Sequence, residues 1–138
     1  MIPKPKKQLS YKAAMRKADQ AFSKFIRARD TGILAGTLGG RCISCGHFKH
    51  YTELQCGHFI NRKHLSLRFD EINCNSQCVS CNCFDEGNNI GYTQGLIKKY
   101  NRHILDYLSA AKRNHVKYTV FELELIAQKY KDKLKGLK

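Results

Sequence analysis

The chain has 138 residues, a length that allows one folded domain and little more. Its 25 Lys and Arg residues outnumber the 11 Asp and Glu residues, which gives a formal net charge of +14. Such an excess attracts polyanions, of which nucleic acid is the commonest, so we expect a nucleic-acid-binding protein. A membrane partner is disfavoured, because no stretch is long enough to span a bilayer and no basic segment has a bulky apolar face.

Seven cysteines indicate a bound metal more than a set of disulfides. The basic N-terminal residues are not followed by the apolar run of a secretory signal, so we expect the protein to stay in the cytoplasm. Cysteines in that reducing compartment are more often thiolate ligands than disulfide partners. An odd number would also leave one cysteine without a disulfide partner.

Residues 1–9 are basic, contain both prolines and are predicted to form a flexible arm, and residues 10–138 are assigned to a single domain. Residues 10–30 are predicted to be a helix, because apolar side chains recur at three- and four-residue spacings. Ser10 is the expected N-cap of this helix. The opposite face is basic and is expected to hold a nucleic-acid backbone through residues that include Lys24, Arg27 and Arg29.

Residues 92–135 are predicted to be helical again, as two helices. Apolar residues from Leu96 to Leu108 follow one helical stripe. Thr119, followed three residues later by Glu122, matches a capping box and is expected to begin the last helix. We interpret both stripes as packing surfaces, since a coiled coil with a partner chain would need a longer repeat.

Two Cys-x2-Cys pairs are the strongest motif in the sequence, and their members are Cys42, Cys45, Cys78 and Cys81. Four thiolates satisfy tetrahedral Zn2+ without an open position, which is the structural type of zinc site. The gap between the pairs exceeds the ~15–20 residues of a compact zinc ribbon, so an insert the size of a hairpin separates them. Two alternatives stay open: a group of buried free cysteines, or another ligand set that includes Cys56, Cys74 or Cys83.

A zinc knuckle, a hairpin and then a helix that carries the second cysteine pair is the treble-clef arrangement. We therefore expect an α+β fold in which residues 41–90 form a zinc-stapled ββα-metal core, with one helix before it and two after it. The hairpin is expected within residues 51–60, with Gly57 near its bend, and the helix is expected to start near residues 78–82. Zinc would hold this helix against the hairpin, so groups on the two elements would face one another across a small site.

The candidate catalytic residues lie in and around this insert: His58, Asn73, Asn82 and Asp85. Hydrolysis of a phosphodiester needs a base near neutral pH and a cation held by oxygen ligands. We assign His58 as the base, with Mg2+ or Mn2+ held close to it by Asn82 and by Asp85, three residues further along a helix. Asn73 is expected to fix the imidazole tautomer through a side-chain hydrogen bond.

Each of these residues also has a structural interpretation. A lone histidine is more often structural than catalytic, and Asn73 is as well suited to capping a turn. Asn82 and Asp85 could be solvated residues of a first helical turn. The basic segment that follows His58 is most simply a phosphate-binding loop, formed by Arg62, Lys63, His64 and Arg68.

Several segments of the chain resemble the NinG (Rap) recombination proteins of lambdoid phages: residues 22–30, 42–46, 57–62, 67–73 and 77–82. The resemblance extends from about Ala18 to Leu108. It implies a phage or prophage endonuclease that cuts branched DNA, including Holliday junctions and D-loops. Because a four-way junction has two-fold pseudo-symmetry, we expect a homodimer.

The site is also similar to that of HNH nucleases of the phage endonuclease VII type, in which an asparagine directly follows the last zinc cysteine. The similarity implies that His58 is the base and that Asn82 binds the catalytic cation. The chain departs from many HNH enzymes at Gly57, where they carry an Asp or His that binds the metal; water, Asp85, Glu71 or Asp70 would have to complete the ligand set. A module that binds branched DNA or structured RNA without cutting it is therefore the alternative.

Overall fold

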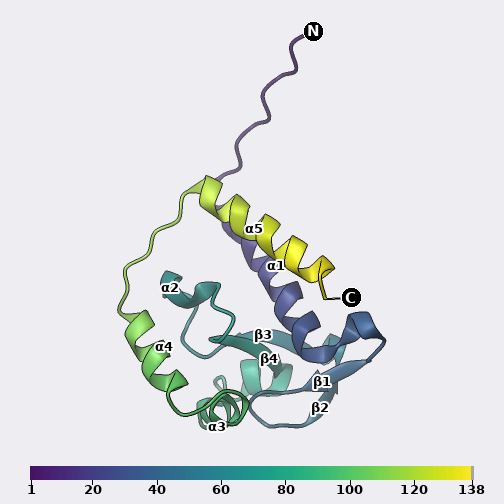
Figure 1. Ribbon diagram of the computed structural model, residues 1–138, viewed down its shortest axis with the longest axis vertical. Helices are drawn as coiled ribbons and strands as arrows, with labels where there is room; N and C mark the ends of the chain where they lie inside the picture. The colour runs from purple at the N-terminus through teal and green to yellow at the C-terminus, as the bar shows by residue number, and fades with distance from the viewer. Residues whose placement is uncertain (138) are drawn as a thin grey trace.

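The computed structural model describes residues 1–137 and has an α+β fold with two small antiparallel sheets (Figure 1). The helices are α1 (Tyr11–Thr31), α2 (Leu65–Arg68), α3 (Asn89–Lys99), α4 (Ile104–Lys112) and α5 (Val120–Lys135). The strands are β1 (Gly39–Arg41), β2 (Phe48–His50), β3 (Leu54–His58) and β4 (Cys74–Cys78). Short helical turns are formed by Ile33–Ala35, Tyr51–Glu53 and, as a π-helix, by η3 (Ser80–Phe84).

Helix α1 begins and ends at the residues that local chemistry favours. The Ser10 hydroxyl accepts a hydrogen bond from the Ala13 amide at 3.1 Å, which confirms the predicted N-cap. Gly32 ends the helix in the left-handed conformation, with φ of 62°, and its N–H donates to the Ala28 carbonyl. The buried face of α1 carries the predicted apolar residues, including Ala18, Phe22 and Ile26.

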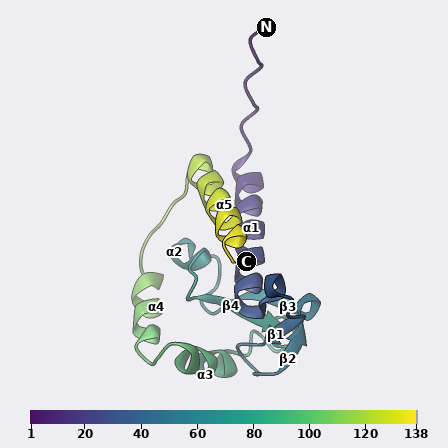
Figure 2. The same cartoon turned by 45° about the vertical axis from the view of Figure 1, so that its right-hand side comes forward.

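Helix α5 lies alongside α1, as Figures 1 and 2 show, although more than eighty residues separate the end of α1 from the start of α5. The rings of Phe22 and Tyr130 pack edge to face with their centroids 4.8 Å apart. Leu123 packs with Ala14 and Ala18 at the other end of the same interface. The predicted capping box at the start of α5 is confirmed, with Thr119 and Glu122 each accepting the other's backbone N–H. Of this pair, α1 forms one wall of the site described below.

The central hairpin pairs β3 with β4, not two halves of residues 51–60. Gly57 lies inside β3, opposite Asn75, so the prediction that it sits near a bend is wrong. A Cβ at this position would come within 2.2 Å of the Gln77 side-chain oxygen, so the strand needs glycine here for close packing. The connection from β3 to β4 runs through residues 59–73 and carries α2.

The C-terminal part contains three helices, where the sequence predicted two. The predicted stripe from Leu96 to Leu108 is interrupted after Tyr100, and the chain turns between α3 and α4. Both helices still bury their apolar residues in one cluster, because Leu96 and Leu108 meet Leu67 and Tyr92. None of the helices within residues 1–137 is both long enough and apolar enough to cross a lipid bilayer.

Candidate functional site

Four cysteine sulfurs converge between the two sheets. Cys42 and Cys45 lie in the turn between β1 and β2, whereas Cys78 ends β4 and Cys81 lies in η3. The four Sγ atoms all lie within 4.8 Å of one another, and those of Cys45 and Cys78 are 3.9 Å apart. Tetrahedral Zn2+ with Zn–S bonds of ~2.3 Å places its sulfurs about 3.8 Å apart, so the cluster has the dimensions of such a site.

The surroundings of these sulfurs also suit thiolates bound to a cation. The backbone N–H of Cys78 donates to Cys42 Sγ at 3.3 Å, and Asn88 Nδ2 donates to Cys81 Sγ at 3.4 Å. Burial raises the pKa of Cys45 and raises that of Cys81 to about 12. A bound divalent cation would lower these pKa values again, because it favours the charged thiolate form of every sulfur around it. The predicted residues therefore fit a structural zinc ion.

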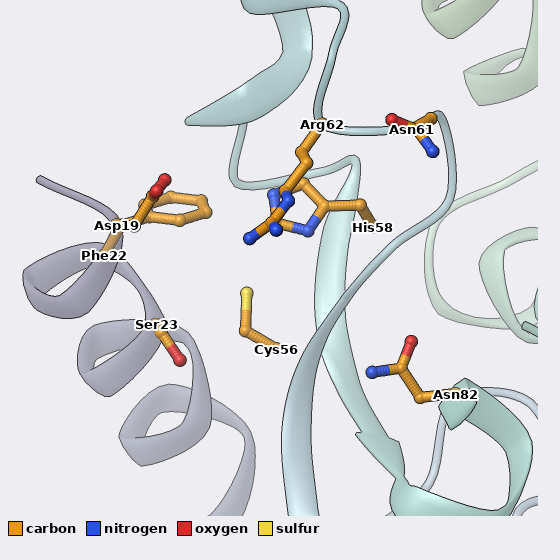
Figure 3. A pocket seen from close by; sticks show the side chains of 8 residues that line it. All are labelled: Asp19, Phe22, Ser23, Cys56, His58, Asn61, Arg62 and Asn82. Carbon is orange, nitrogen blue, oxygen red and sulfur yellow. The ribbon is translucent and has the colours of Figure 1, made fainter. Parts of the chain in front are cut away.

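A pocket of about 330 Å³ lies between α1 and strand β3. Figure 3 shows the side chains of His58 and Cys56 on the side of the strand that faces α1, with the side chain of Arg62 crossing the His58 ring in this view. Helix α1, strand β3, the loop after it and η3 all contribute to the lining, which consists of Asp19, Phe22, Ser23, Cys56, His58, Asn61, Arg62 and Asn82.

His58 is held in one tautomer by a backbone carbonyl. Its Nε2 lies 3.0 Å from the Arg68 carbonyl oxygen, and a carbonyl can only accept, so Nε2 carries the proton. Nδ1 therefore keeps the lone pair. Burial lowers the pKa of His58 below its usual value, although the hydrogen bond to Arg68 opposes this effect in part. The imidazole is thus neutral near pH 7, the form in which it can act as a base.

Arg68 has a structural partner that the sequence did not predict, and its expected contact with phosphate stays a prediction. Its guanidinium forms a two-point ion pair with Asp19 of α1, with Nε–Oδ1 and Nη2–Oδ2 distances of 2.8 and 2.5 Å. The pair joins α2 to α1 and so fixes the carbonyl that holds His58. Sequence reasoning missed Asp19, because no local pattern links it to a residue nearly fifty positions away.

Asn73 does not contact the imidazole, so the predicted hydrogen bond between Asn73 and His58 is wrong. The side chain is fully buried, and its Oδ1 accepts from the Ile60 amide at 2.8 Å. Its Nδ2 donates to the carbonyls of Ile60 and Leu67, at 3.0 and 3.1 Å. Asn73 therefore ties together the two ends of the loop that follows His58, and it shapes the pocket without facing it.

Asn82 borders the same pocket as His58, but Asp85 does not. Asn82 Nδ2 donates to the side-chain oxygen of Gln55 at 2.8 Å, which leaves its amide oxygen without a hydrogen-bond partner among residues 1–137. Asp85 is exposed and lies beyond Phe84, where the π-helix ends. The predicted pairing of Asn82 and Asp85 on one helical face therefore fails, because the helix is only a single turn long.

The remaining basic residues divide into a structural arginine and surface groups. Arg29 donates to Asp30, to the carbonyls of Glu71 and Cys74 and to Asn75, so its predicted role in DNA binding is corrected to a clamp between α1 and β4. His64 is half-buried at the start of α2. The exposed and half-buried cations line two shallow grooves next to the pocket. One groove is lined in part by Lys12, Arg16, Arg62 and Lys63. The other is lined in part by Lys24 and Arg27.

Comparison with known proteins identifies the family to which this chain belongs. The family described as "Bacteriophage Lambda NinG protein" matches residues 4–138. The chain is 34% identical over 125 residues to "Protein ninG" of Escherichia phage 933W, 33% to that of Salmonella phage P22 and 32% to that of Escherichia phage lambda. Each alignment covers 90% of this chain but only 57–58% of the relative, so the chain spans little more than half their length. No solved structure matches. The chain belongs to the NinG family, as the resemblance in its sequence predicted.

Proposed function

We propose that this protein is a structure-specific DNA endonuclease that hydrolyses phosphodiester bonds in branched DNA, such as Holliday junctions and D-loops, during phage recombination. The observation that carries the proposal is the hydrogen bond between His58 Nε2 and the Arg68 carbonyl. It leaves a neutral imidazole with its lone pair on Nδ1 at the edge of a polar, basic pocket. Three further features support the proposal: the chain belongs to the NinG family, it is strongly basic, and four of its cysteines are placed to bind zinc.

In this proposal the core is a treble clef of the HNH type. The cysteine cluster joins the β1–β2 turn to the end of β4 and to η3, so zinc would hold Asn82 in place beside β3. His58 Nδ1 takes a proton from the attacking water, and the Arg68 carbonyl keeps the ring oriented as charge develops on it. Arg62, exposed at the rim of the pocket, offers its guanidinium to the scissile or a neighbouring phosphate.

Mg2+ or Mn2+ would be the catalytic cation, neutralising charge on the phosphorus centre and the leaving oxygen. Asn82 is the residue that would hold it, because it borders the pocket and its amide oxygen has no hydrogen-bond partner within residues 1–137. Mg2+ keeps several of its waters and needs only one or two protein ligands beside the phosphate oxygens of a substrate. Asp85 is not part of this ligand set, since it lies outside the pocket.

The grooves on either side of the pocket would hold the DNA backbone. The first groove has a volume of about 610 Å³ and lies between the first half of α1 and the loop that carries Arg62 and Lys63. The second lies along the second half of α1, where Lys24 and Arg27 are found. Phosphates bound in both grooves would bring the intervening linkage to His58. Two copies of the chain, one for each of two symmetry-related strands, would match the two-fold symmetry of a junction.

A module that binds branched DNA without cutting it is the second candidate. The position before His58 is Gly57, and the buried Gln77 side chain fills the space where a side chain there would lie. Asp85 lies outside the pocket, and Asp19, the carboxylate that lines it, is paired with Arg68. This observation favours binding over catalysis, so the two functions must be separated by experiment.

The test uses a labelled synthetic four-way junction and a linear duplex of the same sequence. Each is incubated with the purified protein in Mg2+, in Mn2+ or in EDTA, and binding is measured in parallel. The proposal expects cleavage of the junction in Mg2+ or Mn2+, much weaker cleavage of the duplex, and none in EDTA. Tight binding of the junction without cleavage under all three conditions would establish the binding module instead.

A further inference from the structure

A second group of metal-binding side chains lies at the pocket, apart from the four-cysteine cluster. Cys56 and His58 are two residues apart on β3 and so project from the same face of the strand. Cys74 pairs with His58 across the hairpin. One ligand atom from each of the three residues lies within 4.8 Å of the other two. The four Sγ atoms of the four-cysteine cluster lie equally close to one another, within 4.8 Å.

The two groups are too far apart to share one ion. Cys74 and Cys78 mark the two ends of β4, and four residues of extended strand span about 13 Å. The Sγ atoms of the four-cysteine cluster gather around Cys78, at the far end of the hairpin from His58. A metal at Cys56, His58 and Cys74 would therefore be a separate ion with its own affinity.

The ligand types select the kind of metal. Thiolate and imidazole ligands favour soft or borderline cations such as Zn2+, whereas Mg2+ and Mn2+ prefer oxygen. Three protein ligands would leave the fourth position of a tetrahedral ion open. That position would face the pocket, because Cys56 and His58 line it while Cys74 is fully buried behind them.

We propose that Cys56, His58 and Cys74 form a second Zn2+ site, with its open position toward the pocket. A neutral imidazole has a single lone pair, so a metal that binds either ring nitrogen removes the only base at His58. Zinc at this site therefore blocks cleavage, a consequence that rests on the proposed nuclease function. The binding of the ion itself does not depend on that function.

The competing interpretation is that both thiols are packing residues. Cys74 belongs to the apolar cluster that includes Phe22 and Phe25, and Cys56 packs against this cluster. A purely apolar role accounts for Cys74, but it gives no reason for a second thiol and an imidazole to converge on it at the border of a polar pocket. Metal analysis separates the two interpretations directly.

The experiment counts zinc in the intact protein. Wild type, Cys56→Ser and Cys83→Ser are exposed to one further equivalent of Zn2+, freed of loose metal on a desalting column and analysed by plasma mass spectrometry. Cys83 is the matched control, because it is an exposed cysteine outside both clusters. We expect about two zinc ions per chain in wild type and Cys83→Ser, but about one in Cys56→Ser. About one zinc ion in all three proteins would overturn the proposal.

A spectroscopic readout guards against a folding defect in Cys56→Ser. In wild type, Co2+ added to the one-zinc protein should produce the thiolate charge-transfer and d–d bands of a tetrahedral site, and these should be absent in Cys56→Ser and in His58→Ala. Circular dichroism of each variant reports whether the fold is retained. If wild type shows no such bands, or if both variants keep them while folded, the site does not exist.

The effect on cleavage is measured as a ratio within each protein. The rate of junction cleavage in Mg2+ is compared with and without the additional equivalent of Zn2+. Wild type and Cys83→Ser should lose most of their rate, whereas Cys56→Ser should keep its own rate unchanged by zinc. Equal inhibition of all three proteins would contradict zinc control through this site. Should no protein cleave DNA, the proposed nuclease function fails, while the metal count still decides the second site.

Discussion

The imidazole of His58 and the backbone carbonyl of Arg68 lie 3.0 Å apart, and the side chain of the same Arg68 is anchored to Asp19 on α1. The orientation of the candidate base thus depends on an ion pair formed by a different helix. The ion pair and the hydrogen bond belong to one residue, so a change in α1 reaches the pocket through Arg68. No pattern in the sequence indicates this relationship, because Asp19 and Arg68 are 49 positions apart.

Replacing Asp19 with Asn should slow cleavage while DNA binding is retained. Arg68 would lose its two-point partner, and its carbonyl would hold the His58 ring less firmly. The loss of stability should be roughly 1–3 kcal/mol, between the values for exposed and buried ion pairs. Urea unfolding and initial cleavage rates measure the two effects. Asp106→Asn, an exposed substitution on α4, is the control and should change neither quantity.

The pH dependence of cleavage should reflect the buried position of His58. Burial lowers its pKa below the usual value of about 6.5, so the neutral form persists to lower pH than for a free imidazole. Protonation removes the lone pair, and the rate should therefore fall only as pH drops below about 6.5. The measurement is kcat/KM on a labelled junction from acid to neutral pH. An acid limb centred above the usual histidine value would contradict the assignment.

Replacing Asn73 with Ala should lower stability by roughly 2–4 kcal/mol, because three backbone groups in a buried or half-buried setting lose their partner. These groups are the Ile60 amide and the carbonyls of Ile60 and Leu67. Asn73→Asp should not recover the loss, because it keeps the acceptor for the Ile60 amide but turns a buried carboxylate oxygen toward the two carbonyls. Denaturant unfolding provides the measurement. Wild-type stability combined with lost cleavage would instead support a direct catalytic role for Asn73.

Substitution of Arg62 should affect DNA binding, whereas substitution of Arg29 should affect stability. Arg62→Ala should weaken DNA binding and reduce the slope of log Kd against log salt by about one, as expected for one lost phosphate contact. Arg29→Gln should instead lower stability, since its guanidinium bonds to Asp30, Asn75 and two backbone carbonyls. Lys112→Ala, at the exposed end of α4, is the control for both. If Arg29→Gln changed the slope of log Kd against log salt and Arg62→Ala did not, Arg29 and not Arg62 would be the phosphate contact.

Removal of the structural metal should unfold the core. Structural zinc supplies about 10–16 kcal/mol in zinc-finger peptides, far more than most other single interactions in a protein this size. Cys45→Ser should therefore lose zinc and show a much lower melting temperature, whereas Cys83→Ser should match wild type. Thermal melts followed by circular dichroism, with zinc analysis of the same samples, test this expectation. A metal-free Cys45→Ser protein with wild-type stability would refute it.

The features that were predicted correctly depend on residues close together in the sequence. The caps at Ser10 and Thr119 act on amides three residues away, and each Cys-x2-Cys pair is a local motif whose chemistry calls for a second pair. The periodicity of α1 was readable for the same reason. These signals sufficed for the α+β class and for the four cysteines that come together as candidate zinc ligands.

The features that were missed depend on contacts between distant segments. The partners of Arg29 and Arg68 lie on other elements, so two inward-facing arginines were predicted to be surface groups. The π-helical turn ends at Phe84, and this places Asp85 away from Asn82 although their spacing suits an α-helix. Gly57 was placed near a bend because glycine favours turns, whereas here it makes room for the Gln77 side chain.

The most direct test of the account is the cleavage of a labelled four-way junction by His58→Ala beside wild type, with binding measured on the same samples. If His58 is the base, the variant should bind the junction as wild type does and should cleave it roughly 10²–10⁴-fold more slowly in Mg2+ or Mn2+. Cleavage by His58→Ala at the wild-type rate would contradict the central claim, whichever cation supports it.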